Sequence, residues 1–158
     1  MEYRTADKYR RMLRAYDVLK RVNTDNGNSI SNTDARDAAE DFFNQSHHLK
    51  DWLKKDTSIK ADQDIEQFIN NSQCLRLAAD FCNSFKHGGL NKSSRSGQEI
   101  EKLNTHIKFD LTSKGFVASS RLEITISGRS YDAYKLAREC VEAWDSYLRN
   151  NQIIFPEP

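Results

Sequence analysis

The chain has 158 residues, of which 24 are basic and 23 acidic, leaving a net charge of +1. This length predicts one domain spanning residues 1–158, and the balance of charge argues against a polycation that coats nucleic acid. Three cysteines, an odd number without close spacing, argue against a disulfide scaffold or a zinc finger. The first residues lack an apolar leader core, and no stretch approaches about 18 apolar residues. We therefore expect a cytoplasmic protein without membrane association.

Apolar residues recur every three or four positions through several segments, which is the pattern of amphipathic helices. Residues 88–104 lack this regularity and are expected to form an exposed loop, with one helical turn near Ile100 and Leu103. The pattern predicts four long helices and one short helix. The long helices lie at about 2–22, 34–55, 73–87 and 131–150, and the short one at about 62–70.

The period of the apolar pattern changes to two in the segment at about 105–127, which predicts a β-hairpin with a turn at residues 113–115. Ser130 is expected to cap the last helix, and residues 151–158 to form a tail. A lone hairpin is marginally stable, so this one must pack on the helices or pair with another chain. The fold class predicted is therefore mainly α: an up-and-down helical bundle with a β-hairpin inserted before the last helix.

Four polar residues share one stripe of the helix predicted at 73–87. At 100° per residue, Arg76, Asp80, Asn83 and His87 fall within about 60° of one another. A functional interpretation assigns them to a catalytic site. A structural interpretation is an Arg76–Asp80 ion pair one turn apart, with His87 favoured near the helix C-terminus by the helix dipole. Both interpretations stay open at this point.

The helix predicted at 34–55 adds His48, Asp51 and Trp52 on the side away from its apolar stripe, and these residues are candidates for substrate binding. Asp51 is expected to orient an imidazole. Trp52 suggests a partner or a groove, although cover by the short helix at 62–70 is the preferred explanation. Histidine and aspartate also bind metals, but their spacing here matches no strong metal signature, so no metal and no cofactor are expected.

Cys74 and Cys82 fall on the apolar side of the helix predicted at 73–87. We expect them to face the core, where a thiol stays protonated and unreactive.

The segment Asn83-Ser84-Phe85-Lys86-His87-Gly88 resembles the end of the third helix of HEPN domains (higher eukaryotes and prokaryotes nucleotide-binding). The resemblance implies a helical bundle that dimerises. Many members are metal-independent endoribonucleases of toxin–antitoxin or phage-defence systems, and others bind nucleotides or are inactive. His87 matches the motif histidine and Asn83 the motif asparagine. The motif arginine is missing, because Cys82 occupies its place.

Two functions follow from this pattern. The first is a non-catalytic or degenerate HEPN-like interaction module in a prokaryotic defence or toxin–antitoxin context. It would form a homodimer or bind RNA or protein, with the polar stripe buried as a hydrogen-bond network. The alternative is a metal-independent endoribonuclease in which His87 acts as general acid/base, Asn83 orients substrate and Arg76 or Lys86 contacts phosphate. Asp80 and Asp51 would then hold Arg76 and His87. Cys82 favours the module.

Overall fold

The computed structural model describes residues 3–24, 32–87, 100–112, 115–126 and 128–158. Within them, four helices are followed by three strands and a last helix, which confirms the mainly helical bundle with a hairpin before the last helix. The elements are α1 (Tyr3–Thr24), α2 (Asn32–Lys55), α3 (Ile65–Asn70), α4 (Gln73–His87), β1 (Ile100–Thr112), β2 (Gly115–Ile126), β3 (Arg129–Asp132) and α5 (Ala133–Asn150).

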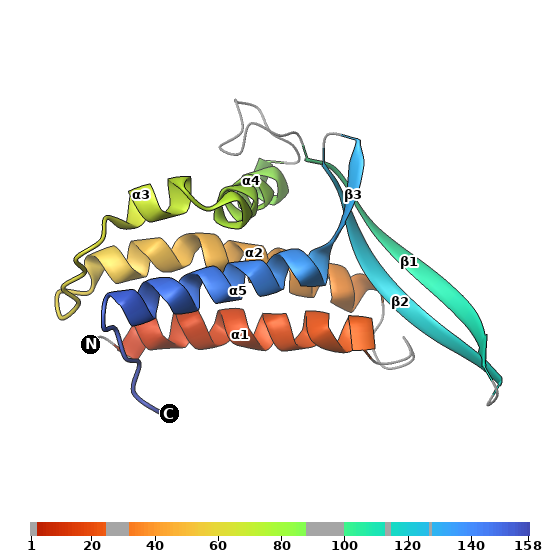
Figure 1. The fold of residues 1–158 in the computed structure, drawn as a ribbon, viewed down its shortest axis with the longest axis horizontal. Coiled ribbons are helices and arrows are strands. Elements are labelled where there is room, and N and C mark those ends of the chain that lie inside the picture. Colours follow the sequence, from red (N-terminus) through yellow and green to blue (C-terminus); the bar gives the residue numbers. More distant parts are fainter. Residues whose placement is uncertain (1–2, 25–31, 88–99, 113–114, 127) are drawn as a thin grey trace.

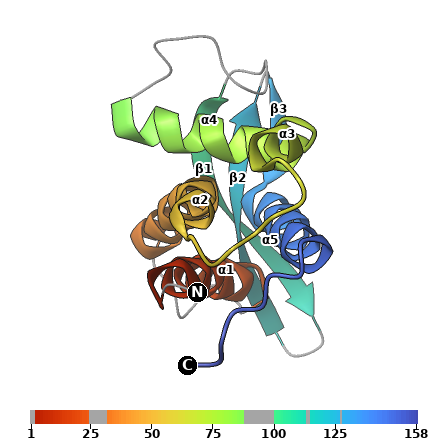
Figure 2. The same ribbon diagram turned by 90° about the vertical axis from the view of Figure 1, so that its left-hand side faces the viewer.

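Three long helices form the body of the molecule. α1 lies beside α2 and α5 and runs in the opposite direction to both (Figure 1). The fourth long helix, α4, does not join this array. It lies across α2 and α5, as Figure 2 shows, where the three body helices are seen end-on and α4 is seen along its length. The apolar periodicity predicted the helices but gave no information on this crossing.

The core lies where the body helices meet α4. Trp144 of α5 is fully buried there. Its indole Nε1 donates to the carbonyl oxygen and to the Oγ of Ser46 on α2, both at 3.1 Å. Phe43 of α2 stacks on Phe81 of α4 with ring centroids 4.7 Å apart. A buried indole is stable only when its N–H is paired, so the Ser46 contact also orients α5 against α2.

β1 and β2 form the predicted antiparallel hairpin, but β1 is longer than expected. It begins at Ile100, so the expected loop and helical turn are wrong for residues 100–104. The pairing with β2 continues beyond the expected start of the strand, because Leu103 lies opposite Ile124 and Asn104 opposite Glu123. The end of the predicted loop is therefore strand, while residues 88–99 lie outside the described part of the chain.

A short third strand, which the sequence did not predict, precedes α5. β3 pairs antiparallel with β2, with Tyr131 opposite Ile124, and Gly128 in the turn between them adopts a positive φ of 78°. Ser130 therefore lies in a strand and does not cap the last helix. The cap is Asp132, whose Oδ1 accepts a hydrogen bond from the Lys135 backbone N–H at 3.1 Å.

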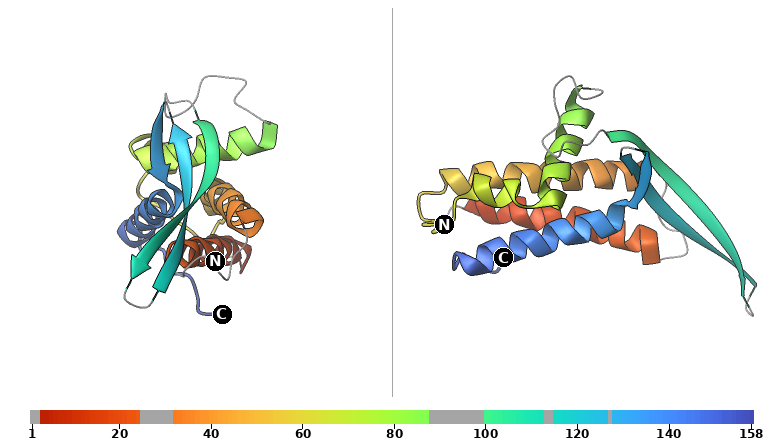
Figure 3. Two further views of the ribbon diagram at one scale, coloured as in Figure 1. Left: turned by 90° about the vertical axis from the view of Figure 1, so that its right-hand side faces the viewer. Right: turned by 45° about the horizontal axis from the view of Figure 1, so that its top comes forward.

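The sheet lies across one end of the helices (Figure 3), and its order is β1-β2-β3. Leu122 and Ile124 of β2 are buried and belong to the same core as the helices. The hairpin thus packs on the bundle at its base, as its marginal intrinsic stability requires. Its distal part, toward the turn, extends away from the helices (Figure 1).

The C-terminal segment, expected to be a simple tail, packs back on α1. The rings of Tyr9 and Phe155 lie 4.9 Å apart, and Arg10 donates a hydrogen bond to the carbonyl oxygen of Pro156. The Tyr9 hydroxyl also donates to Asp145 of α5. α1, α5 and the tail are therefore joined at this end of the bundle.

We predict that Trp144→Phe destabilises the protein much more than Trp52→Phe. The first change removes the donor to Ser46 inside the core, and an unpaired buried group costs roughly 1–3 kcal/mol, in addition to lost packing. At about 2–4 °C per kcal/mol, thermal melting followed by circular dichroism should show a fall of several degrees. Trp52 is only partly buried, and an equal loss in both variants would contradict the anchoring role of Trp144.

Candidate functional site

The crossing of α4 divides the polar stripe that the sequence predicted. Asp80 is buried, with 1% exposure, and interacts with another residue of the chain. Asn83, less than one turn later, is exposed, and Arg76 is partly buried. The prediction that Asp80 shares one surface with Asn83 is wrong, because α2 and α5 cover only part of the circumference of a helix that crosses them. The stripe is therefore not one continuous site.

The expected Arg76–Asp80 ion pair is also not what the structure shows. The Arg76 guanidinium donates to the side chain of Gln73, one turn earlier on α4. Its Nε is buried and has no hydrogen-bond partner among the described residues. Arg76 thus points toward the beginning of α4, away from the end that carries the HEPN-like segment.

Lys86 and His87 are the last two residues of α4, and their side chains lie outside the described part of the chain. Their assignments, phosphate contact for Lys86 and general acid/base for His87, remain predictions.

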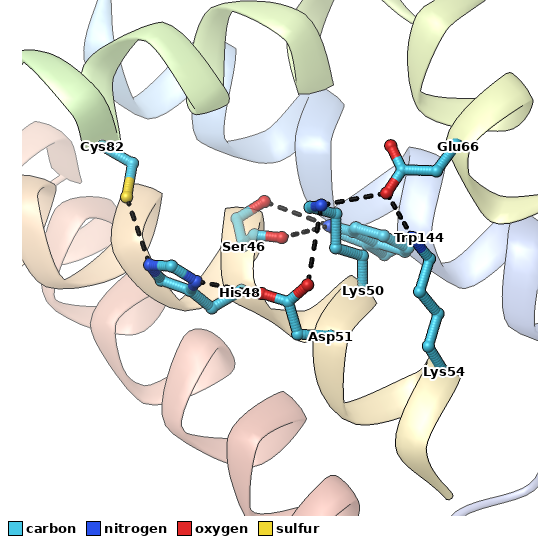
Figure 4. Close-up of polar contacts among 8 residues, drawn as sticks. All are labelled: Ser46, His48, Lys50, Asp51, Lys54, Glu66, Cys82 and Trp144. Atoms are coloured by element: carbon cyan, nitrogen blue, oxygen red, sulfur yellow. Dashed lines mark hydrogen bonds and ion pairs between the residues drawn. The ribbon is translucent and has the colours of Figure 1, made fainter.

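The structure assembles a polar cluster between α2 and α4 (Figure 4). His48 Nδ1 lies 3.2 Å from Oδ2 of Asp51, so the imidazole that Asp51 contacts belongs to its own helix. The expectation that Asp51 holds His87 concerns a side chain outside the described residues and stays a prediction. The other ring nitrogen, Nε2, lies 3.5 Å from the Sγ of Cys82 on α4. A carboxylate, an imidazole and a thiol thus form a chain in the order used by nucleophilic cysteine sites. Cys82, however, is only 3% exposed, so a substrate has no open approach to its thiol.

The electrostatics of this cluster are visible at Asp51. Partial burial acts to raise the pKa of its carboxyl group, but the hydrogen bond from His48 and the charge of Lys50 outweigh it, and the pKa is lowered. Lys50 Nζ lies 3.5 Å from Asp51 and 2.9 Å from Glu66 of α3, and Lys54 pairs with the same glutamate. The cluster therefore joins α3 to α2 through ion pairs and α2 to α4 through the contact between His48 and the Cys82 thiol.

Trp52 is partly buried, and the contact that the structure gives it comes from α1. Lys8 Nζ lies 5.4 Å from the centroid of the indole ring, within the range of a cation–π interaction. The sequence predicts that the segment at 62–70 covers Trp52, but the contact that the structure gives comes from Lys8 instead. α3 is held to α2 through Glu66, while Trp52 faces the N-terminal part of α1.

The sequence did not point to Cys74, the residue whose surroundings most favour reactivity. It was expected to be an inert core thiol, but it is only partly buried, and its pKa is lowered to about 7. The signal was present in the order Ser72-Gln73-Cys74, because a cysteine in the first turn of a helix is exposed to unpaired backbone N–H groups. The prediction missed this signal because Cys74 falls on the apolar side of the helix and was therefore assigned to the core.

Comparison of the chain with protein-family models, curated proteins and solved structures finds no match. In the described part of the chain, no three histidine, cysteine, aspartate or glutamate side chains are grouped as a metal site would require. No described helix is both long enough and apolar enough to cross a membrane.

Asp80→Ala should lower the melting temperature by several degrees, whereas Asn83→Ala should change it little. Asp80 is buried and interacts with another group of the chain, so its removal breaks a buried polar interaction, and losses of this kind cost about 1–3 kcal/mol. Substitutions of exposed residues such as Asn83 usually stay within about 0.5 kcal/mol. Thermal melting of both variants, followed by circular dichroism, provides the measurement. Equal losses would show that Asn83 belongs to a buried network after all.

His48→Ala should raise the pKa of Asp51 toward its ordinary value, because the strongest of the interactions that lower it is lost. Since the folded-state pKa lies below the ordinary value, the contribution of this carboxylate to stability is present at neutral pH. It is lost as the pH falls through the folded-state pKa. Carbon-13 NMR titration of the carboxyl group measures the shift. His47→Ala is the control, and an identical shift in both variants would exclude a specific His48–Asp51 pair.

Proposed function

We propose that this chain is a HEPN-like interaction module that acts by binding, with a second copy of itself as the partner, and that it does not cleave RNA. The observation that carries the proposal is the position of Cys82. This residue stands where the HEPN motif has its arginine, and it is buried against His48 of α2. A side chain at this position of α4 faces the interior of the bundle and is not available to hold a phosphate.

The charged residues expected to assist catalysis support the same conclusion. Asp80 is buried, and Arg76 is bonded to Gln73 near the other end of α4. Arg76 is directed away from the end of α4 that carries the HEPN-like segment, and the buried position of Asp80 leaves its carboxylate no open surface on which to meet a substrate. The His48–Asp51 pair instead binds α4 to α2 through Cys82. These side chains hold the helices together, and a module that works by binding does not require catalytic residues.

The sheet offers a surface for self-association. β1 has 13 residues, and in the described part of the chain it pairs only with β2, so it forms one edge of the sheet. The hairpin also extends beyond the helices (Figure 3). A long edge strand exposes a row of unpaired backbone groups that readily pair with another chain. Antiparallel pairing of two β1 strands about a two-fold axis would join two copies through identical surfaces.

The test of self-association uses proline at two adjacent positions of β1. Backbone N–H groups of an antiparallel strand alternate between its two sides, so one of Ile107→Pro and Lys108→Pro removes a bond to β2 and the other removes only a group on the open edge. Sedimentation velocity should show a dimer for the unmodified chain and a monomer for the variant changed on the open edge, which keeps its helical circular dichroism. A monomeric unmodified chain, or dimers in both variants, would overturn the proposal.

Catalysis is tested separately, with mixed RNA in EDTA and the unmodified chain beside His87→Ala. The module predicts no cleavage by either protein. Cleavage by the unmodified chain that disappears in His87→Ala would establish the metal-independent endoribonuclease and refute the non-catalytic part of the proposal. General acid–base catalysis by one histidine contributes typically about 10²–10⁴-fold, so such a loss would be plain.

A further inference from the structure

Two cysteines from distant parts of the sequence meet where α4 begins and packs on α5. Cys74 is the second residue of α4, and Cys140 lies in the middle of α5, 66 residues later. The Sγ of Cys140 donates to the backbone carbonyl oxygen of Cys74 at 3.4 Å, and the Cys140 thiol lies close enough to the Cys74 sulfur to influence its pKa. The third cysteine, Cys82, lies two turns further along α4 and contacts His48.

The two thiols have opposite characters. The hydrogen bond from Cys140 is the largest influence on the Cys74 thiol. Together with the Ser72 hydroxyl, 3.2 Å away, and the Leu75 backbone N–H, it lowers the pKa to about 7, against the opposing effects of burial and of Glu139. Cys140 is completely buried, and burial is the first cause that raises its pKa well above the ordinary value. One thiol is thus half ionised near neutrality, and the other stays protonated.

Cys74 opens into a pocket of about 230 Å³ between the first turn of α4, β3 and the beginning of α5. Tyr131 and Leu136 supply apolar surface there, and Asp132, Lys135 and Glu139 are the charged groups around the opening. A water molecule occupies roughly 30 Å³, so the pocket admits a peroxide easily. Cys140 has no such access, because its side chain is covered on all sides.

We propose that Cys74 and Cys140 form a redox pair in which a peroxide oxidises Cys74 to a sulfenic acid and Cys140 then condenses with it to a disulfide between α4 and α5. The arrangement of one accessible thiol and one buried thiol in contact with it is what carries this assignment. It is independent of the proposed binding function.

Each step balances. In the first, the Cys74 thiolate attacks one oxygen of hydrogen peroxide, the O–O bond breaks, and the departing hydroxide takes up a proton to become water. The sulfur is oxidised by two electrons and the peroxide is reduced. In the second, the Cys140 sulfur attacks the sulfenic sulfur and the S–O bond breaks. The Cys140 proton leaves with the hydroxide as a second water molecule. A thiol reductant returns the disulfide to two thiols by exchange and is itself oxidised to a disulfide.

The test uses the reduced chain, treated with hydrogen peroxide at neutral pH, alkylated, and digested with trypsin without reductant. Cleavage after lysine and arginine places each cysteine on its own peptide: residues 61–76 carry Cys74, residues 77–86 Cys82, and residues 139–149 Cys140. We expect mass spectrometry to find peptides 61–76 and 139–149 joined, and peptide 77–86 alkylated. A link to peptide 77–86, or Cys74 left as free thiol or as sulfinic acid without a disulfide, would overturn the proposal.

Variants divide the two roles. Cys140→Ser should leave the sulfenic acid of Cys74 unresolved, so that dimedone traps it. Cys74→Ser should abolish the reaction with peroxide, and Cys82→Ser should change nothing in the formation of the disulfide. Circular dichroism shows that each variant is folded. Equal peroxide consumption by Cys74→Ser and the unmodified chain would contradict the assignment of Cys74 as the reacting thiol.

The pH dependence provides a second readout that a purely structural pair would not show. The rate of Cys74 oxidation should rise with pH through about 7 and then level off, because the thiolate is the nucleophile. Ser72→Ala should move this midpoint upward, since it removes a hydrogen bond to the thiolate. Glu139→Gln should move it downward, since it removes a nearby negative charge. Shifts in the same direction for both variants would overturn this account of the site.

Discussion

The indole of Trp144 donates hydrogen bonds to Ser46, and the arrangement of the other helices depends on this contact. Both groups are buried, so the hydrogen bonds compete with no water and fix α5 at one height along α2. α4 lies on the surface that these two helices share, with Phe81 stacked on Phe43. The position of α5 also determines where β3 ends, because Asp132 is both the last residue of that strand and the N-cap of the helix.

Because α4 crosses the body helices, its two halves have different surroundings. The C-terminal half carries Cys82 against His48 of α2, and the N-terminal half carries Cys74 against Cys140 of α5. Two cysteines on one helix therefore differ in chemistry. Cys82 is buried beside an imidazole that is itself held by Asp51, whereas Cys74 opens into a pocket at a helix N-terminus. Position along a crossing helix, rather than residue type, sets the role of each thiol.

The HEPN-like segment and the hairpin belong together in the proposed binding function. Cys82, at the position of the motif arginine, faces the interior of the bundle and cannot bind a phosphate. The sheet adds a surface that a simple helical bundle lacks, the open edge of β1. Leu122 and Ile124 of β2 pack in the core between the helices and hold the base of the sheet in place. The open edge of β1 therefore has a fixed position relative to the bundle. The thiol pair lies where α4 meets β3 and α5, next to that base.

The sequence by itself determined the helices and the hairpin, because apolar periodicity and turn residues act over a few neighbouring positions. The spacing of His48 and Asp51, three residues apart on one helix, makes them neighbours, but the sequence-based prediction assigned Asp51 to His87 and did not name this pair. Only the tertiary structure decided that Asp80 is buried while Asn83 is exposed, that Lys8 covers Trp52, and that Cys74 meets Cys140. The Trp52 contact depends on how α1 packs on α2, whereas the burial of Asp80 and the meeting of the two cysteines depend on the angle at which α4 crosses α2 and α5. That angle is set by side chains far apart in the chain, which no local pattern records.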